Sequence, residues 1–60
     1  MVVYVNGQPV DLAPGMRVRH AVTSAGLQGE IDGGLKVYDE WGHEVGLDGE
    51  LSDGTRLSVK

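Results

Sequence analysis

Hydrophobic and polar residues alternate near the start of the chain, as they do in strands with one buried face. Apolar and aromatic residues fill Val2–Val5, and the Asn6-Gly7 pair that follows is the favoured centre of a two-residue type I′ hairpin turn. The return segment Gln8–Leu12 places Asp11 between apolar neighbours, which predicts a second strand with one wet face. Because Pro9 cannot donate a backbone hydrogen bond, we expect this strand at a sheet edge, or Pro9 at its start.

One helical pattern follows the hairpin. Its apolar residues form a single stripe at helical spacing: Val18, Ala21, Val22 and Ala25. Gly26 stands where helices commonly end in the left-handed conformation, and Leu27 can supply the apolar contact that accompanies such an end. Arg17 stands where Ser, Thr, Asp or Asn would cap the helix. The helix therefore either begins raggedly, or Arg17 and Arg19 serve another purpose.

The second half of the chain reads as short strands between turns. Gln28–Gly34 predicts a flexible polar loop with Ile31 as an apolar plug. Leu35–Tyr38 predicts a third strand, and Glu44–Leu47 a short fourth segment. Thr55–Val59 alternates cleanly and predicts the last strand. The order is hairpin, helix, short strands and final strand, which indicates an α+β fold in one domain spanning residues 1–60.

Composition requires an ordinary aliphatic core. Sixty residues lie near the lower limit at which a single apolar core can hold a fold. The absence of Cys excludes disulfides and thiolate-held zinc or iron–sulfur sites. Abundant Val and ten Gly favour short strands and tight turns over a helical bundle. Residues expected to supply much of the core are Val18, Val22, Leu35, Val37, Leu57 and Val59.

Charge limits the kinds of partner. The formal net charge is −4 and only five residues are basic, so nucleic acid is an unfavourable partner, because phosphate binding needs a concentrated positive field. The N-terminal residues include neither a basic region nor a long apolar run. We therefore expect no signal peptide, no membrane span and a cytoplasmic location.

Two segments resemble known families. The first, from Val5 to Leu27, is VNGQPVDLAPGMRVRHAVTSAGL, which resembles the opening of the sulfur carriers of the thiamine and molybdopterin pathways. The second, from Val45 to Lys60, is VGLDGELSDGTRLSVK, which resembles the close of those carriers and of TGS domains. The resemblance implies a β-grasp (ubiquitin-like) fold: a mixed four- to five-stranded sheet with one helix packed across one face. It leaves Gln28–Gly34 and Glu40-Trp41 without a counterpart.

The chain departs from the sulfur carriers at its C-terminal end. Those carriers end in a flexible Gly-Gly tail whose carboxylate is adenylated and converted to a thiocarboxylate. Here the sequence ends at Lys60 in the predicted last strand, and its only Gly-Gly pair, Gly33-Gly34, is internal. Carrier chemistry therefore requires a longer natural chain.

The acidic stretch Asp39–Leu51 is interpreted as solvated turns rather than a metal site. Calcium needs six or more oxygen ligands in a compact loop, and no EF-hand spacing is present. Zinc needs three or four convergent ligands, and His43 is the only strong one here. Trp41 is expected to fold back as a lid over the core, with an exposed partner-binding anchor as the alternative.

No pattern of nucleophile, base or phosphate-binding loop is present. His20 lies next to the apolar stripe without a neighbouring nucleophile, which is typical of a half-exposed helix residue. The serines lack an elbow or triad context. We therefore expect no enzymatic activity, no catalytic residues and no cofactor.

The face of the sheet away from the helix is the best candidate surface. If Val3 and Val5 face the helix, alternation directs other side chains outward. These are Tyr4, Lys36, Tyr38, Arg56 and Ser58. Two Tyr beside Lys and Arg are typical of protein interfaces. The sequence therefore predicts a module that docks on a larger protein through this face, although a solvated sheet face would carry the same residues.

Two alternative functions remain open. The chain could be a sulfur carrier whose Gly-Gly tail is missing from this sequence. It could also be a TGS-like binder of a small ligand or RNA, in which Arg17 and Arg19 contact an anion at the helix start. The acidic balance counts against RNA.

Overall fold

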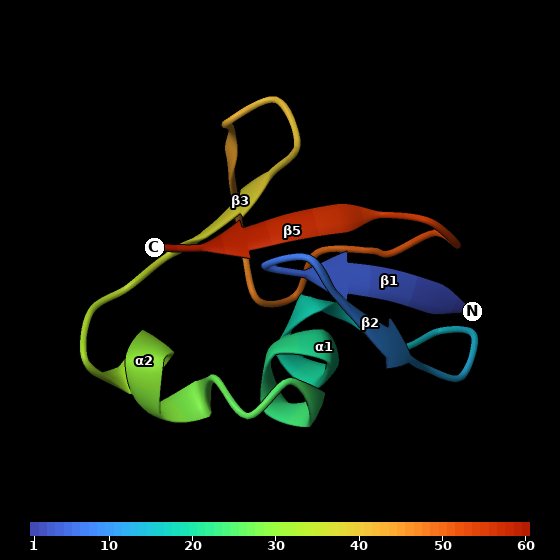
Figure 1. Cartoon of the computed structure of the whole chain (residues 1–60), viewed down its shortest axis with the longest axis horizontal. Coiled ribbons are helices and arrows are strands. Elements are labelled where there is room, and N and C mark those ends of the chain that lie inside the picture. The colour runs from blue at the N-terminus through green and yellow to red at the C-terminus, as the bar shows by residue number, and fades with distance from the viewer.

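The computed structural model describes the whole chain, residues 1–60, as a five-stranded mixed sheet with two short helices. The strands are β1 (Val2–Val5), β2 (Gln8–Asp11), β3 (Val37–Asp39), β4 (Glu44–Val45) and β5 (Arg56–Val59). They lie in the order β2-β1-β5-β3-β4 (Figure 1). The pair β1–β5 is parallel, and all other neighbours are antiparallel. The predicted α+β class with a mixed sheet is therefore confirmed.

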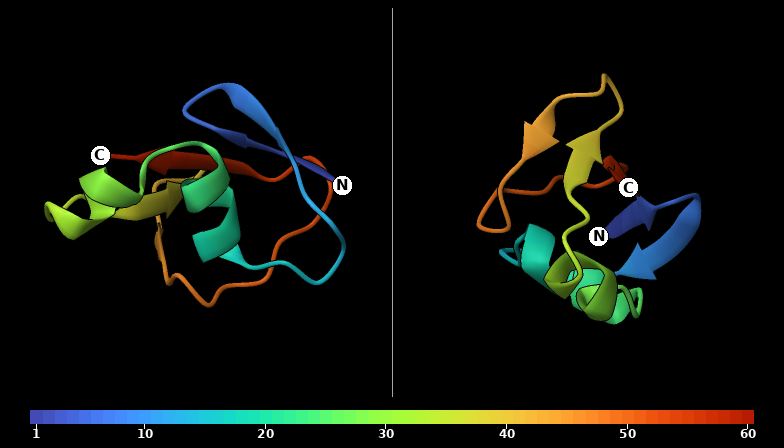
Figure 2. Two further views of the ribbon diagram at one scale, coloured as in Figure 1. Left: turned by 90° about the horizontal axis from the view of Figure 1, so that it is seen from below. Right: turned by 90° about the vertical axis from the view of Figure 1, so that its left-hand side faces the viewer.

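Both helices lie on one side of the sheet. They are α1 (Val18–Ser24) and α2 (Gln28–Asp32), and Figures 1 and 2 show both on the side opposite to the projecting β3–β4 turn. α1 buries Val18, Ala21 and Val22, which are three of the four residues in the predicted stripe. Neither helix is long and apolar enough to cross a membrane.

The first hairpin forms as predicted. Asn6 and Gly7 both have positive φ angles, 52° and 83°, which a type I′ turn requires. Pro9 lies opposite Tyr4 in the edge strand β2. The N–H of Tyr4 donates to the Thr55 carbonyl on the other side, so Pro9 lies at a position where no N–H is needed for pairing with β1. Pro9 therefore reduces the hydrogen-bonding capacity of the free edge.

The ends of α1 are satisfied locally. The backbone N–H of Arg17 donates to Nδ1 of His20 at 2.9 Å. His20, the third residue of the helix, therefore stabilises a start that has no Ser, Thr, Asp or Asn cap. At the other end, Gly26 has a φ of 77°. The N–H groups of Gly26 and Leu27 donate to the carbonyls of Thr23 and Val22, both at 3.0 Å, which completes a Schellman motif.

The core lies between α1 and the sheet. Its ten buried residues are Val3, Val5, Val10, Leu12, Val18, Ala21, Val22, Val37, Leu57 and Val59. Leu35 was expected among them, but this expectation is wrong, because Leu35 is 39% exposed. The third strand begins only at Val37, and the N–H of Leu35 instead bonds to Glu30 of α2. Leu35 therefore belongs to the connection that leaves α2.

The predicted loop over Gln28–Gly34 is corrected by the structure. Residues Gln28–Asp32 form α2, which has no side-chain cap at its start. Ile31 packs against the core, as expected for the apolar plug. Nε2 of Gln28 donates to Oδ1 of Asp32 at 3.1 Å, a spacing of four residues that supports a helical turn. Packing of Ile31 thus stabilises a short helix that Gly29 within it disfavours.

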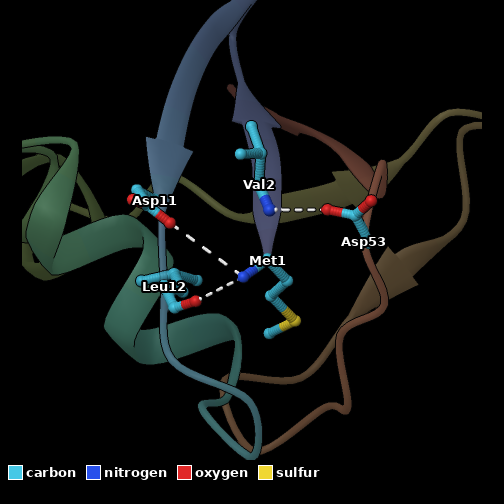
Figure 3. Close-up of polar contacts among 5 residues, drawn as sticks. All are labelled: Met1, Val2, Asp11, Leu12 and Asp53. Carbon is cyan, nitrogen blue, oxygen red and sulfur yellow. Dashed lines mark hydrogen bonds and ion pairs between the residues drawn. The ribbon is translucent and has the colours of Figure 1, made fainter.

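The N-terminal end of β1 is held on both sides (Figure 3). The Met1 ammonium donates to the Leu12 carbonyl at 2.7 Å and lies 4.0 Å from the Asp11 carboxylate. On the other side, the Val2 N–H donates to Oδ1 of Asp53 at 2.7 Å (Figure 3). These contacts fix β1 between its hairpin partner and the turn that leads into β5.

Candidate functional site

The side of the sheet away from the helices is called here the open sheet face. Burial alternates along the strands: Val3 and Val5 are buried, whereas Tyr4 between them is half-buried. The same alternation in β5 and β3 leaves Arg56, Ser58 and Tyr38 accessible. The open sheet face consists of Tyr4, Lys36, Tyr38, Glu44, Arg56, Ser58 and Lys60. It therefore brings together all five residues that the sequence predicted for partner binding.

Tyr4 and Arg56 form the first contact on this face. They are aligned partners across the parallel pair β1–β5. The Arg56 guanidinium carbon lies 4.7 Å from the centre of the Tyr4 ring, within the range of a cation–π contact. This contact holds an exposed cation against an aromatic ring near the middle of the sheet.

Tyr38 and Lys60 form a second contact of the same kind. Nζ of Lys60 lies 5.5 Å from the centre of the Tyr38 ring. Tyr38 is aligned with Ser58 of β5 and with Glu44 of β4. Ser58 therefore lies between the two aromatic contacts along β5.

Sequence reasoning missed Lys60 and Glu44. The alternation of the last strand, continued one residue past buried Val59, would have directed Lys60 outward. Glu44 depends on the register of β3 with β4, which the sequence does not reveal. Oε2 of Glu44 lies 3.7 Å from Nζ of Lys36, so it neutralises one cation of the face.

The two arginines considered for an anion contact lie elsewhere and already have acidic neighbours. The Arg17 guanidinium lies 3.4 Å from the Glu50 carboxylate, and the backbones of the two residues pair in an isolated antiparallel β-bridge. The Arg19 guanidinium forms an ion pair with Asp48. An open hollow beside Arg17 is lined by Gly15, Met16, Arg17, Glu50 and Leu51. The arginines thus fasten the start of α1 to the segment before β5.

In the acidic stretch Asp39–Leu51, the Asp39 side chain organises the turn between β3 and β4. Oδ1 of Asp39 accepts the backbone N–H groups of Trp41 at 3.0 Å and His43 at 2.8 Å. The His43 ring lies 3.6 Å from the same carboxylate. No group of three His, Cys, Asp or Glu side chains is placed to hold a metal ion. Asp39 therefore acts as the structural centre of the β3–β4 turn.

Trp41 does not cover the core. Its side chain is 74% exposed, so the expected lid is wrong. The turn that carries it projects away from both helices in Figure 1 and in the right-hand view of Figure 2. The Asp39 hydrogen bonds hold the backbone of the turn in this position, which leaves Trp41 without a contact to the buried cluster.

Comparisons with known proteins found no match to a family model, a curated protein or a solved structure. The arrangement of side chains is thus the available guide to function. On the open sheet face, that arrangement consists of two Tyr rings, each with a cation beside it.

Proposed function

We propose that the chain is a β-grasp domain, related in architecture to sulfur carriers and TGS domains. The strand order β2-β1-β5-β3-β4 supports this assignment, together with the parallel pair β1–β5 and the packing of α1 on one side. Of the two segments that resemble those families, the first contains β2 and α1, and the second contains β5. The architecture itself leaves the function open, because one fold carries many activities.

The proposed function is a non-catalytic module that docks on a larger protein through the open sheet face. One observation carries this proposal: Tyr4 and Tyr38 alternate along their strands with buried core residues, and each has a cation against its ring. A partner that covers these rings would bury aromatic area and contact the positively charged side chains of Arg56 and Lys60. Docking of this kind requires no nucleophile, metal or cofactor.

The alternatives have less support from the contacts. A TGS-like anion site at Arg17 and Arg19 would have to compete with Glu50 and Asp48, which already neutralise both guanidinium groups. The sulfur-carrier alternative requires residues beyond Lys60. An intact mass of the natural protein tests that alternative directly.

The docking function is tested with the 60-residue chain as bait in lysate of the native host. The test variant is Tyr4→Ala, Arg56→Ala, and the matched control is Arg19→Ala, Thr23→Ala on exposed positions of α1. We expect a partner that the unmodified chain and the control retain and the test variant releases. A partner retained equally by all three baits, or by none, would refute docking through this face.

A further inference from the structure

The unneutralised cations of this acidic protein gather on the open sheet face. Of the five basic residues, Arg17, Arg19 and Lys36 each lie within ion-pairing distance of an acidic side chain. Arg56 and Lys60 form no ion pair and lie against Tyr rings instead. The chain therefore combines a net charge of −4 with a local surface that presents two free positive charges.

The two free cations stand on residues four positions apart. Arg56, Ser58 and Lys60 alternate with buried Leu57 and Val59, so their side chains leave the sheet on the same side. At a rise of about 3.3 Å per residue, Arg56 and Lys60 have Cα atoms roughly 13 Å apart. An extended peptide spans the same distance between residues four positions apart.

The aromatic contacts prepare both cations for binding. A free Arg or Lys side chain loses considerable rotamer entropy when it is fixed in an interface. Here the Tyr4 ring restricts Arg56 and the Tyr38 ring restricts Lys60 before any partner arrives. Part of the ordering cost is thus met in the free protein, which favours binding of complementary charges.

We propose that the open sheet face binds an acidic segment of a partner protein, with one carboxylate on Arg56 and a second on Lys60. This inference rests on the proposed docking function and specifies the chemistry of its partner. A second copy of the chain fits poorly, because the same face would present two positive charges to two positive charges. Nucleic acid fits poorly as well, because two free cations neutralise few of the closely spaced charges of a phosphate backbone.

The probe is a capped peptide, Ser-Glu-Thr-Val-Thr-Glu-Ser, which places its glutamates four positions apart. Its counterpart carries Gln at both positions. Each peptide is titrated into isotopically labelled protein at low ionic strength, and backbone amide signals are followed by NMR. We expect the glutamate peptide to shift signals of β1, β3 and β5, with affinity falling as salt is added.

Two double variants separate local charge from net charge. Arg56→Gln, Lys60→Gln should weaken binding of the glutamate peptide by about tenfold or more, because it removes both proposed contacts. Arg17→Gln, Arg19→Gln removes the same charge from the start of α1 and should leave the signal shifts on the open sheet face in place. Equal losses in both variants, equal binding of the Gln peptide, or no binding at millimolar peptide would overturn the proposal.

The outcomes also distinguish this inference from the docking function. If the peptide fails while Tyr4→Ala, Arg56→Ala still releases a captured partner, docking stands and the acidic partner is wrong. If the pull-down identifies no partner that depends on the face, the docking function itself fails. Tighter binding of a single-stranded oligonucleotide of equal charge would also overturn the acidic-protein proposal.

Discussion

The side chain of Asn6 holds the backbone of Val59, 53 residues further along the chain. Its Oδ1 accepts the Val59 N–H at 2.9 Å, and its Nδ2 lies 3.5 Å from the Val59 carbonyl oxygen. Asn6 also occupies a positive φ in the hairpin turn. One residue therefore shapes the first turn and fastens the end of the last strand.

Substitutions at Asn6 should separate these two roles. Asn6→Gly keeps the positive φ and removes the side-chain bonds, so we expect a loss of about 1–2 kcal/mol in the free energy of unfolding. Asn6→Ala also strains the turn and should lose roughly 1 kcal/mol more. Urea unfolding measures both losses. Equal stability of Asn6→Gly and the unmodified chain would show that the Val59 contact contributes nothing.

The last strand should depend on Leu57. Leu57→Ala removes a buried side chain and should lower the free energy of unfolding by about 2–5 kcal/mol, a large share of the total stability of so small a domain. Leu47→Ala is the matched control, because Leu47 is an exposed leucine and should cost less than about 1 kcal/mol. Thermal unfolding followed by circular dichroism compares the two. Similar losses would contradict the assignment of Leu57 to the core.

Trp41 should report its own exposure. It is the only Trp in the chain, so its fluorescence can be assigned without labelling. We expect emission typical of an indole in water, ready quenching by acrylamide, and little change on unfolding. Trp41→Ala should alter the free energy of unfolding by less than about 0.5 kcal/mol. Blue-shifted emission that moves to the red on unfolding would place the ring in a buried site.

Asp39 should control the order of the β3–β4 turn. Asp39→Ala removes the acceptor for the N–H groups of Trp41 and His43, so both amides should exchange with solvent hydrogen faster. Asp39→Asn keeps an amide oxygen as acceptor and should restore much of the protection. Native-state hydrogen exchange measured by NMR compares the variants. Unchanged exchange in Asp39→Ala would mean that the carboxylate does not organise the turn.

The parts of the fold that the sequence predicted correctly carry local signals. Asn6-Gly7 encodes a turn, the stripe from Val18 to Val22 encodes a helix face, and Gly26 encodes its end. Leu57 and Val59 alternate with polar residues and are buried as expected. Each of these features depends on a few neighbouring residues. Outward orientation of Tyr4 and Arg56 follows from the same alternation.

The features that the sequence did not reveal depend on distant contacts. Ile31 stabilises α2 by packing against the core, although Gly29 and Gly33 make the segment resemble a loop. The beginning of β3 is set by pairing with β5, which leaves Leu35 outside the core. Trp41 illustrates a different limit: the scarcity of apolar area favours a lid over the core, but the hydrogen bonds of Asp39 that direct the turn outward are not visible in the sequence.

The parallel pairing of Tyr4 with Arg56 has a consequence for how the chain acquires its structure. The two partners come from opposite ends of the sequence, so the sheet cannot close until nearly the whole chain is available. A newly made N-terminal half contains only an isolated hairpin and a short helix, and such pieces are marginal in water. Contacts of this range also slow folding, because a long loop must close before they form. The domain should therefore acquire its native state late and in one cooperative step.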